Sequence, residues 1–183
     1  MNGRNPRRGH WHALWLGSLA LATATGCLSS AASRNVTVWI VGGDEELASD
    51  SAASPENEVF SASRREVRLR AALNETIAFQ IGLRTTTPPA GPFDVHVSDL
   101  AGGADTLPAG SVVAVYRVRY TRVDRFRSWY PDHTGRPATP ALFPDVLVPW
   151  DAPHGGGPMI LSEDRNEFVW IELRVPPTVA AGE

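Results

Sequence analysis

Side chains able to bind a metal or move protons gather in one proline-rich stretch of the chain. Imidazole nitrogens and carboxylate oxygens are ordinary metal ligands. Their spacing here, however, matches neither an HExxH helix nor an EF-hand loop, so we expect no metal and no cofactor. A carboxylate just after a proline, as at position 145, is typical of a capped turn. The residues concerned are Asp132, His133, Asp145, Asp151 and His154.

Catalysis by this chain has little support in its sequence. It has no GxSxG motif, which would mark a nucleophilic serine. Two carboxylates about 5–9 Å apart would suit glycoside hydrolysis, but a sequence does not give that distance. We therefore assign no catalytic residue.

Aromatic residues in the same stretch are candidate contacts for a ligand. Trp129, Tyr130 and Trp150 offer flat faces that suit the CH-rich side of a sugar ring. The same residues would also suit packing on the domain or on a following domain, and we favour packing.

The N-terminal segment, residues 1–26, has the pattern of a bacterial lipoprotein signal. Three arginines precede an uncharged, mostly apolar run at 11–25, shorter than the roughly 20 residues that span a bilayer. The following ATGC resembles a lipobox, in which the cysteine, here Cys27, is lipidated and becomes the new N-terminus. The alternative, a secretory signal cut after Ala24, would leave the one cysteine as an unpaired thiol.

The sequence therefore predicts an exported protein with a lipid anchor in the cell envelope, in the outer membrane if the cell is Gram-negative. Residues 27–35 suit a tether. The mature chain carries 14 arginines against 20 acidic residues, an acidic balance that disfavours nucleic acid as a partner. Arg117 and Arg119 fit a solvated strand face with partners such as Glu172 better than a nucleic-acid surface.

The segment LNETIAFQIGLR, residues 73–84, reads as a turn followed by a strand. Asn74 tolerates the left-handed backbone of a tight turn. Glu75 is open to a functional reading, but we expect its carboxylate to accept hydrogen bonds from backbone donors near the turn, with Gln80 in a similar role. Together with EVRLRA at 66–71, the segment predicts a hairpin over 66–84.

Alternation of apolar and polar residues predicts an all-β fold. Further strands are expected at 36–41, 93–100, 112–120 and 167–175. Strands separated by Gly/Pro turns predict an antiparallel β-sandwich of immunoglobulin-like or jelly-roll type over residues 36–183. Residues 126–166, with seven prolines, are expected to form one long, ordered Pro/Gly-rich loop.

Five segments are notable for their order and spacing: ALNETIAFQIGLR at 72–84, YRVRY at 116–120, WYPDHTG at 129–135, FPDVLVPW at 143–150 and FVWIELRVPPTVAAGE at 168–183. Taken in this order, they resemble the N-terminal β-sandwich domain of glycoside hydrolases of the family 123 type and of related uncharacterised bacterial proteins.

In that family a (β/α)-barrel follows the sandwich and carries the catalytic acids, and none of those acids falls on a matching position here. The resemblance implies a non-catalytic module that supports or positions a following barrel on carbohydrate, with a sandwich incomplete at its C-terminal end. The final strand, 167–175, would then lie beside the missing one. The alternative is a free-standing surface lipoprotein that binds carbohydrate or protein.

Overall fold

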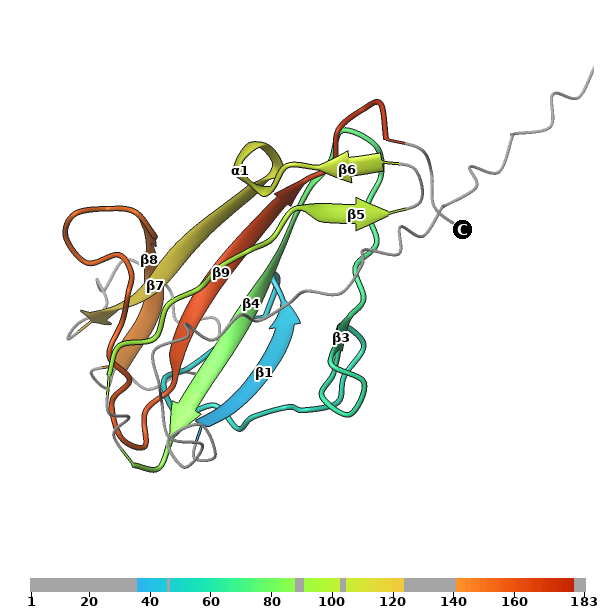
Figure 1. The fold of residues 1–183 in the computed structure, drawn as a ribbon. Helices are drawn as coiled ribbons and strands as arrows, with labels where there is room; N and C mark the ends of the chain where they lie inside the picture. Colours follow the sequence, from blue (N-terminus) through green and yellow to red (C-terminus); the bar gives the residue numbers. More distant parts are fainter. Residues whose placement is uncertain (1–35, 46, 88–90, 103–104, 124–140, 180–183) are drawn as a thin grey trace, which may run out of the picture.

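The structure, a computed structural model, describes residues 36–45, 47–87, 91–102, 105–123 and 141–179. One antiparallel sheet of five strands dominates it (Figure 1). In spatial order the strands are β1 (Val36–Gly42), β4 (Thr76–Thr85), β9 (Glu167–Arg174), β7 (Val113–Val123) and β8 (Ala141–Pro149).

Short elements complete the described part of the chain. Two small hairpins flank the sheet, and one turn of helix leads into β7. No helix in the described ranges is long and apolar enough to cross a bilayer. The short elements are β2 (Phe60–Ser61) with β3 (Glu66–Val67), β5 (Leu100–Gly102) with β6 (Asp105–Leu107), and α1 (Ala109–Val112).

Strand register divides the sheet into two faces, because residues opposite one another in neighbouring strands share a face. One face, called here the aliphatic face, carries buried side chains on β1, β4 and β9, all of them branched aliphatic except Phe79. The other, called the aromatic face, carries five rings. The aliphatic face consists of Ile40, Phe79, Ile81, Val169 and Ile171, and the aromatic face of Trp39, Tyr116, Tyr120, Phe168 and Trp170.

A glycine on β4 makes room for the largest ring of the aromatic face. Trp39 and Phe168 lie opposite the two sides of Gly82, and a Cβ on Gly82 would come within 2.3 Å of the Trp39 ring. The edge-to-face contact between Trp39 and Phe168, with centroids 5.7 Å apart, therefore depends on this glycine. Both faces of β4 are buried, so it is a two-sided core strand.

The turn before β4 has the predicted local geometry but joins different partners. Asn74 has φ 62°, and Glu75 Oε2 accepts a hydrogen bond from the backbone N–H of Ala72 at 2.6 Å. The predicted 66–84 hairpin is wrong, however. β3 pairs with β2, whereas β4 pairs with β1 and β9, because the buried surface of β4 needs a long neighbour on each side.

The strand predicted at 93–100 is also wrong. Its alternation of burial is present, since Phe93 and Val95 pack on the core while Asp94 and His96 are exposed. Yet the segment runs extended across the sheet (Figure 1), with a single bridge from Phe93 to Met159 before β5 begins. A two-residue period reports one buried face of an extended chain and not a hydrogen-bonded neighbour.

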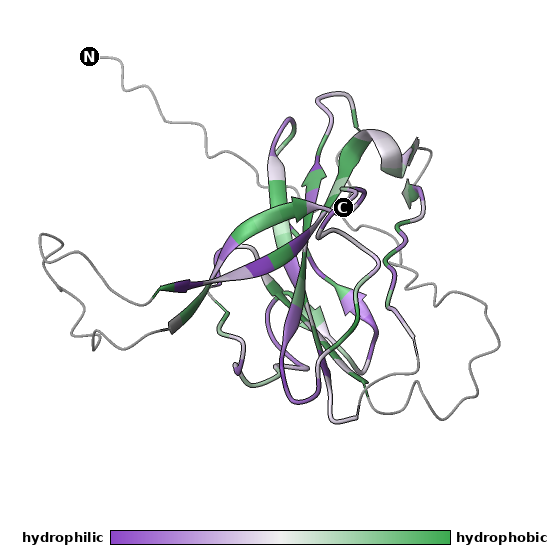
Figure 2. Ribbon diagram, turned by 90° about the vertical axis from the view of Figure 1, so that its left-hand side faces the viewer, coloured by the Kyte–Doolittle hydropathy of each residue, from purple (hydrophilic) through white to green (hydrophobic). Residues whose placement is uncertain are grey.

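The long loop predicted at 126–166 contains a strand. Within it, β8 pairs along β7, so the loop prediction is wrong over 141–149. Pro144 and Pro149 are compatible with β8 because it is an edge strand. The distal residues of β7, from Tyr120 onward, pair with β8 and not with β9, and this part of the ribbon extends away from the other strands (Figure 2).

The predicted position of the last strand is wrong as well. β9 lies between β4 and β7, so Val169, Ile171 and Leu173 are buried inside the sheet rather than beside a missing strand. The all-β, antiparallel fold is confirmed. The sandwich arrangement stays a prediction, because the described chain forms one large sheet with short hairpins around it.

Candidate functional site

A groove opens on the aromatic face of the sheet, between the loop that follows β1 and the edge strand β8. Its volume is about 340 Å³, at the small end of the range of ligand sites, about 300–1,000 Å³. It is lined by Gly43, Asp44, Glu45, Gln80, Val118, Pro144, Asp145, Leu147 and Trp170.

Pairing of four strands builds the floor of the groove. Gln80 of β4 lies opposite Trp170 of β9, and Trp170 lies opposite Tyr116 of β7. Val118 is one step further along β7 on the same face and lies opposite Leu147 of β8. The floor residues Gln80, Val118, Leu147 and Trp170 are thus 23 to 90 positions apart in the chain, and the sheet register fixes their side-by-side order.

Glu172 holds the aromatic wall of the groove in place. Trp170 Nε1 donates to Glu172 Oε1 at 3.2 Å, and the Tyr116 hydroxyl lies 3.5 Å from Glu172 Oε2. Residues 170 and 172 share one face of β9 because side chains alternate along a strand. One carboxylate therefore orients two neighbouring rings, and it does so from beside the groove.

Gln80 ties one rim of the groove to the floor. Its side chain is 4 % exposed, and its Nε2 donates to the carbonyl oxygens of Glu45 at 2.7 Å and Gly42 at 3.4 Å. A buried amide of this kind fixes the loop backbone. The backbone of the rim between Gly42 and Glu45 is therefore anchored to the floor of the groove.

A β-bulge supplies the opposite rim. Arg119 lies opposite Val146, but the next residue of β7, Tyr120, lies opposite Pro144. Asp145 is thus the extra residue of β8. Bulges re-aim side chains and bend the strand, which explains how an edge strand turns a carboxylate toward the groove.

Tyr120, next to the bulge, makes structural contacts with the core. Its hydroxyl donates to the Leu47 carbonyl at 3.1 Å, and the Arg165 guanidinium lies 5.5 Å from its ring centroid. Burial raises the pKa of the Tyr120 hydroxyl well above its ordinary value, against the opposing effect of Arg165. The phenol is therefore neutral at physiological pH and acts as a hydrogen-bond donor.

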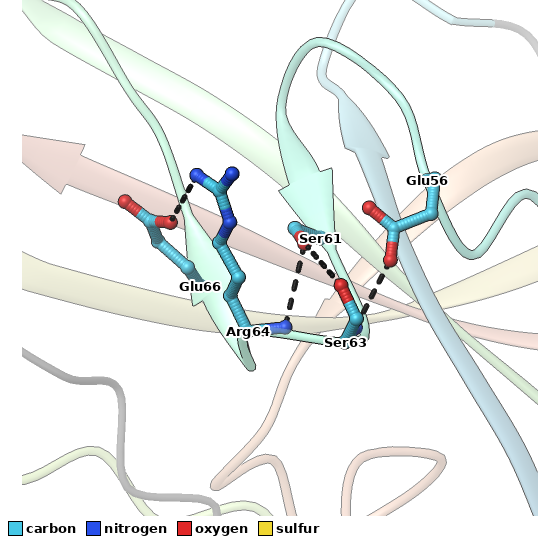
Figure 3. Close-up of polar contacts among 5 residues, drawn as sticks. All are labelled: Glu56, Ser61, Ser63, Arg64 and Glu66. Carbon is cyan, nitrogen blue, oxygen red and sulfur yellow. Dashed lines mark hydrogen bonds and ion pairs between the residues drawn. The ribbon is translucent and has the colours of Figure 1, made fainter.

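A second polar cluster lies at the turn of the β2–β3 hairpin (Figure 3). Glu56 Oε1 accepts from the Ser63 backbone N–H at 3.0 Å, and this bond, with smaller contributions from the side chains of Ser61 and Ser63, lowers the pKa of Glu56. Arg64 and Glu66 form an exposed pair at 3.9 Å. All these contacts close the turn, so the cluster is structural.

The arginine-rich strand is placed differently from the prediction. Arg117 is 13 % exposed and pairs with Glu167 at 3.3 Å, so it is a half-buried ion pair on the aliphatic face. The predicted partner Glu172 lies on the opposite face, with Trp170 and Tyr116. The solvated-face interpretation holds for Arg119, which is exposed.

Of the three aromatic candidates, Trp129 and Tyr130 lie outside the described residues, as does Cys27, the predicted lipid acceptor. Trp150 lies within them. Trp150 Nε1 donates to Asp94 Oδ1 at 2.9 Å, and a Cβ on Gly157 would come within 2.0 Å of its ring. The Trp150 ring is therefore engaged within the domain.

The described residues contain no cluster of side chains that could hold a metal ion. Over these ranges no three His, Cys, Asp or Glu side chains converge closely enough to hold an ion. Of the residues weighed as ligands in the sequence, Asp145 lies in the groove and His154 lies on the turn after β8, outside the groove lining.

Sequence reasoning missed the groove residues Trp170, Asp44 and Glu45. One signal was available for Trp170, because it occupies the polar face of the alternation Val169, Trp170, Ile171, Glu172. A large ring on that face has to be covered or exposed to a ligand. The groove that results offers an aromatic wall and hydrogen-bond acceptors, a combination suited to recognising a polar ring.

Comparisons with known proteins place the fold. No family model matches the sequence, and a search of curated proteins finds no match. Among solved structures, the chain is similar to a family 123 glycoside hydrolase from Clostridium perfringens, whose structural analysis concerns glycolipid glycan hydrolysis. The TM-score is 0.53 at 14 % identity, over 80 % of this chain and 22 % of that one. The chain thus has a distant, glycoside hydrolase-like relation at the level of fold, and it spans about a fifth of the enzyme's length.

Proposed function

We propose that this chain is a non-catalytic module of an exported glycoside hydrolase-like lipoprotein, which supports or positions a following (β/α)-barrel on carbohydrate. The observation that carries the proposal is the shared fold, which covers 80 % of this chain and 22 % of a family 123 glycoside hydrolase. A match of those proportions is what a module of a longer enzyme would give.

The groove on the aromatic face supports a role in contacting sugar. Trp170 presents a ring held by Glu172, and aromatic faces suit the CH-rich side of a pyranose. Asp145, on the β8 rim of the groove, supplies carboxylate oxygens that accept hydrogen bonds from hydroxyl or amino groups. These are the ingredients of a small carbohydrate site.

The alternative is a free-standing surface lipoprotein that binds carbohydrate or protein by itself.

The DNA downstream of codon 183 tests the modular role. An open frame that encodes a (β/α)-barrel is the expected result. A stop codon followed by an unrelated gene would reject the modular proposal and leave the free-standing one.

A glycan array probed with the detergent-solubilised full chain tests sugar contact. Binding to at least one glycan class is expected, and it should fall when Trp170 is replaced by alanine. Trp150→Ala is the matched control, because that ring contacts Gly157 and lies outside the groove. Equal loss in both variants would point to damage to the fold, and no binding at all would reject sugar contact.

Lipid anchoring is tested by labelled palmitate. The wild-type chain should incorporate the label, and Cys27→Ser should not, because the thiol would carry the lipid. Equal labelling of both would reject the anchor.

A further inference from the structure

One extended segment that crosses the sheet, residues 93–99, lacks a neighbouring strand over most of its length (Figure 1). Phe93 exchanges two backbone hydrogen bonds with Met159, at 2.7 and 2.8 Å. From position 94 to position 99, no residue forms a backbone–backbone hydrogen bond with the described part of the chain. Two of the inner side chains nevertheless pack on the core, those of Phe93 and Val95. The segment is therefore fixed in place without being part of a sheet.

The alternation along the segment identifies its open edge. Backbone groups of successive residues in an extended chain point to opposite sides. Those of Phe93 point to Met159, so the N–H and C=O groups of Asp94, His96 and Ser98 point to the opposite edge. The last three residues are exposed, and the His96 side chain is 68 % exposed. A second strand would find hydrogen-bonding groups along this edge.

The open edge lacks the backbone features that prevent strand pairing at β8. Residues 93–99 contain neither proline nor glycine, whereas β8 has two prolines and a bulge. An unpaired edge without such protection is a template for a strand of another chain. An incoming strand would have to place apolar side chains toward the core and polar side chains outward, as this segment does.

The segment itself has the pattern that such a partner strand needs. If two copies pair antiparallel with Val95 opposite Val95, then Phe93 lies opposite Val97 and Asp94 lies opposite His96. Apolar side chains then face the two cores, and on the outer face a carboxylate meets an imidazole that donates to it. Asp94 and His96 both direct backbone groups to the open edge, so this register places them at hydrogen-bonded positions.

We propose that two copies of this chain associate through antiparallel pairing of residues 93–97, about a twofold axis at Val95. A twofold interface is self-complementary, so the Asp94–His96 contact occurs twice. Asp94 is positioned for it, because its Oδ1 accepts from Trp150 Nε1 at 2.9 Å while its Oδ2 lies on the side of His96, 3.5 Å from Nε2 within one chain. A pairing of so few residues buries less area than a standard interface, so the dimer is a weak one.

Sedimentation equilibrium of the detergent-solubilised full chain, in a solvent matched to the density of the detergent, tests the association. The mass should rise with concentration toward twice that of the monomer. The series extends to about 1 mM, so that even a millimolar dimer is detected. A chain that stays monomeric throughout would overturn self-pairing and leave the edge to a strand of another protein.

A matched pair of charge variants tests the complementary contact. His96→Asp places a carboxylate opposite Asp94 at both ends of the pairing and should weaken the dimer about tenfold or more. His154→Asp makes the same change at an exposed histidine outside the segment and should leave the dimer unchanged. Circular dichroism of both variants establishes that the fold is retained. An unaffected dimer in His96→Asp, or equal weakening in both variants, would overturn the inference.

Cysteine cross-linking tests the register, in a Cys27→Ser background that leaves the introduced thiol alone. Val95→Cys should form a disulfide-linked dimer on mild oxidation with copper phenanthroline, because residues opposite one another at such a position have Cα atoms about 4.5 Å apart. Val97→Cys is the matched control on the same face. Its two copies would lie roughly 13 Å apart along the strands and should not link. Linkage through Val97→Cys alone, or through neither variant, would overturn the proposed pairing.

Discussion

The two edge strands of the sheet, β1 and β8, differ in how their outer sides are covered. On β1, the chain itself covers the outer side, since Asn57 Nδ2 donates to the Ile40 carbonyl at 2.8 Å and Trp39 and Ile40 are buried. On β8, no described strand pairs along the outer side, and Val146 and Leu147 are 43 % and 40 % exposed.

The open edge nevertheless carries features that oppose the addition of another strand. Pro144 and Pro149 cannot donate a backbone hydrogen bond, and the bulge at Asp145 breaks the regular ladder. Prolines, bulges and charges are the usual protection of an exposed edge. β1 is therefore a structural border, whereas β8 presents side chains to the outside and to the groove while its backbone is protected from pairing.

Removing a large side chain from each edge should give the largest difference between them. Trp39→Ala should lower the free energy of unfolding by about 3–5 kcal/mol, because it leaves a cavity between Gly82 and Phe168. Leu147→Ala should change it by no more than about 0.5 kcal/mol, as expected for an exposed position. Urea denaturation followed by circular dichroism measures both. Similar losses in the two variants would remove the distinction.

Removing the side-chain hydrogen bonds that cover the edge of β1 should have an intermediate effect on the free energy of unfolding. Asn57→Ala loses the bond to Ile40 and the two bonds from Val59 and Phe60 N–H to its Oδ1, and should cost about 1–3 kcal/mol. Asn57→Asp keeps an acceptor for the turn but loses the donor to β1, so its cost should be smaller. A negligible cost of Asn57→Asp, measured by the same denaturation, would mean that the bond to β1 contributes nothing, whereas equal costs would mean that the two bonds to Oδ1 contribute nothing.

Removing the protection of β8 should change association more than stability. The double variant Pro144→Val, Pro149→Val should lose about 0.4–1 kcal/mol of unfolding free energy for each proline removed, through the greater freedom of its unfolded chain. It should also self-associate at concentrations where the wild type does not, because its edge can donate hydrogen bonds. Light scattering over a concentration series checks this. An unchanged mass would show that the bulge alone protects the edge.

The smallest effect concerns the hairpin beside β1 and depends on pH. The Ser63 N–H bond lowers the pKa of Glu56 in the folded state below 4.5. Its stabilisation is therefore complete above pH 4.5 and is lost as the pH falls through the folded-state value. The stability difference between wild type and Glu56→Gln should shrink between pH 7 and pH 3. A stability difference that stays constant between pH 7 and pH 3 would contradict this expectation.

Strand positions with strong local signals were predictable from the sequence. β1, β4, β7 and β9 lie within a few residues of the expected ranges, because β-branched and other apolar residues alternate there and Gly or Pro follows closely after β1, β4 and β9. β8 was missed since Pro144 and Pro149 are typical of loops, and only its place at an edge makes them acceptable.

The pairing of the strands and the residues that meet in the groove were not predictable from the sequence in this way. Whether β4 pairs with its sequence neighbour or with β9 depends on which arrangement buries both of its faces, and that is a property of the whole sheet. Gln80, Trp170 and Asp145 meet through this register and through a bulge. No local pattern encodes their proximity.

The central position of β9 has a consequence for how a nascent chain assembles. β9 is the last described strand to be synthesised, yet it joins the β1–β4 pair to the β7–β8 pair. Thr76 and Arg174, which pair across β4 and β9, are almost a hundred residues apart, and contacts of such separation form slowly. The sheet cannot close while residue 174 is still in the ribosome. In a chain exported as proposed, this order of synthesis would delay folding until translocation is under way, without a separate element to hold the chain open.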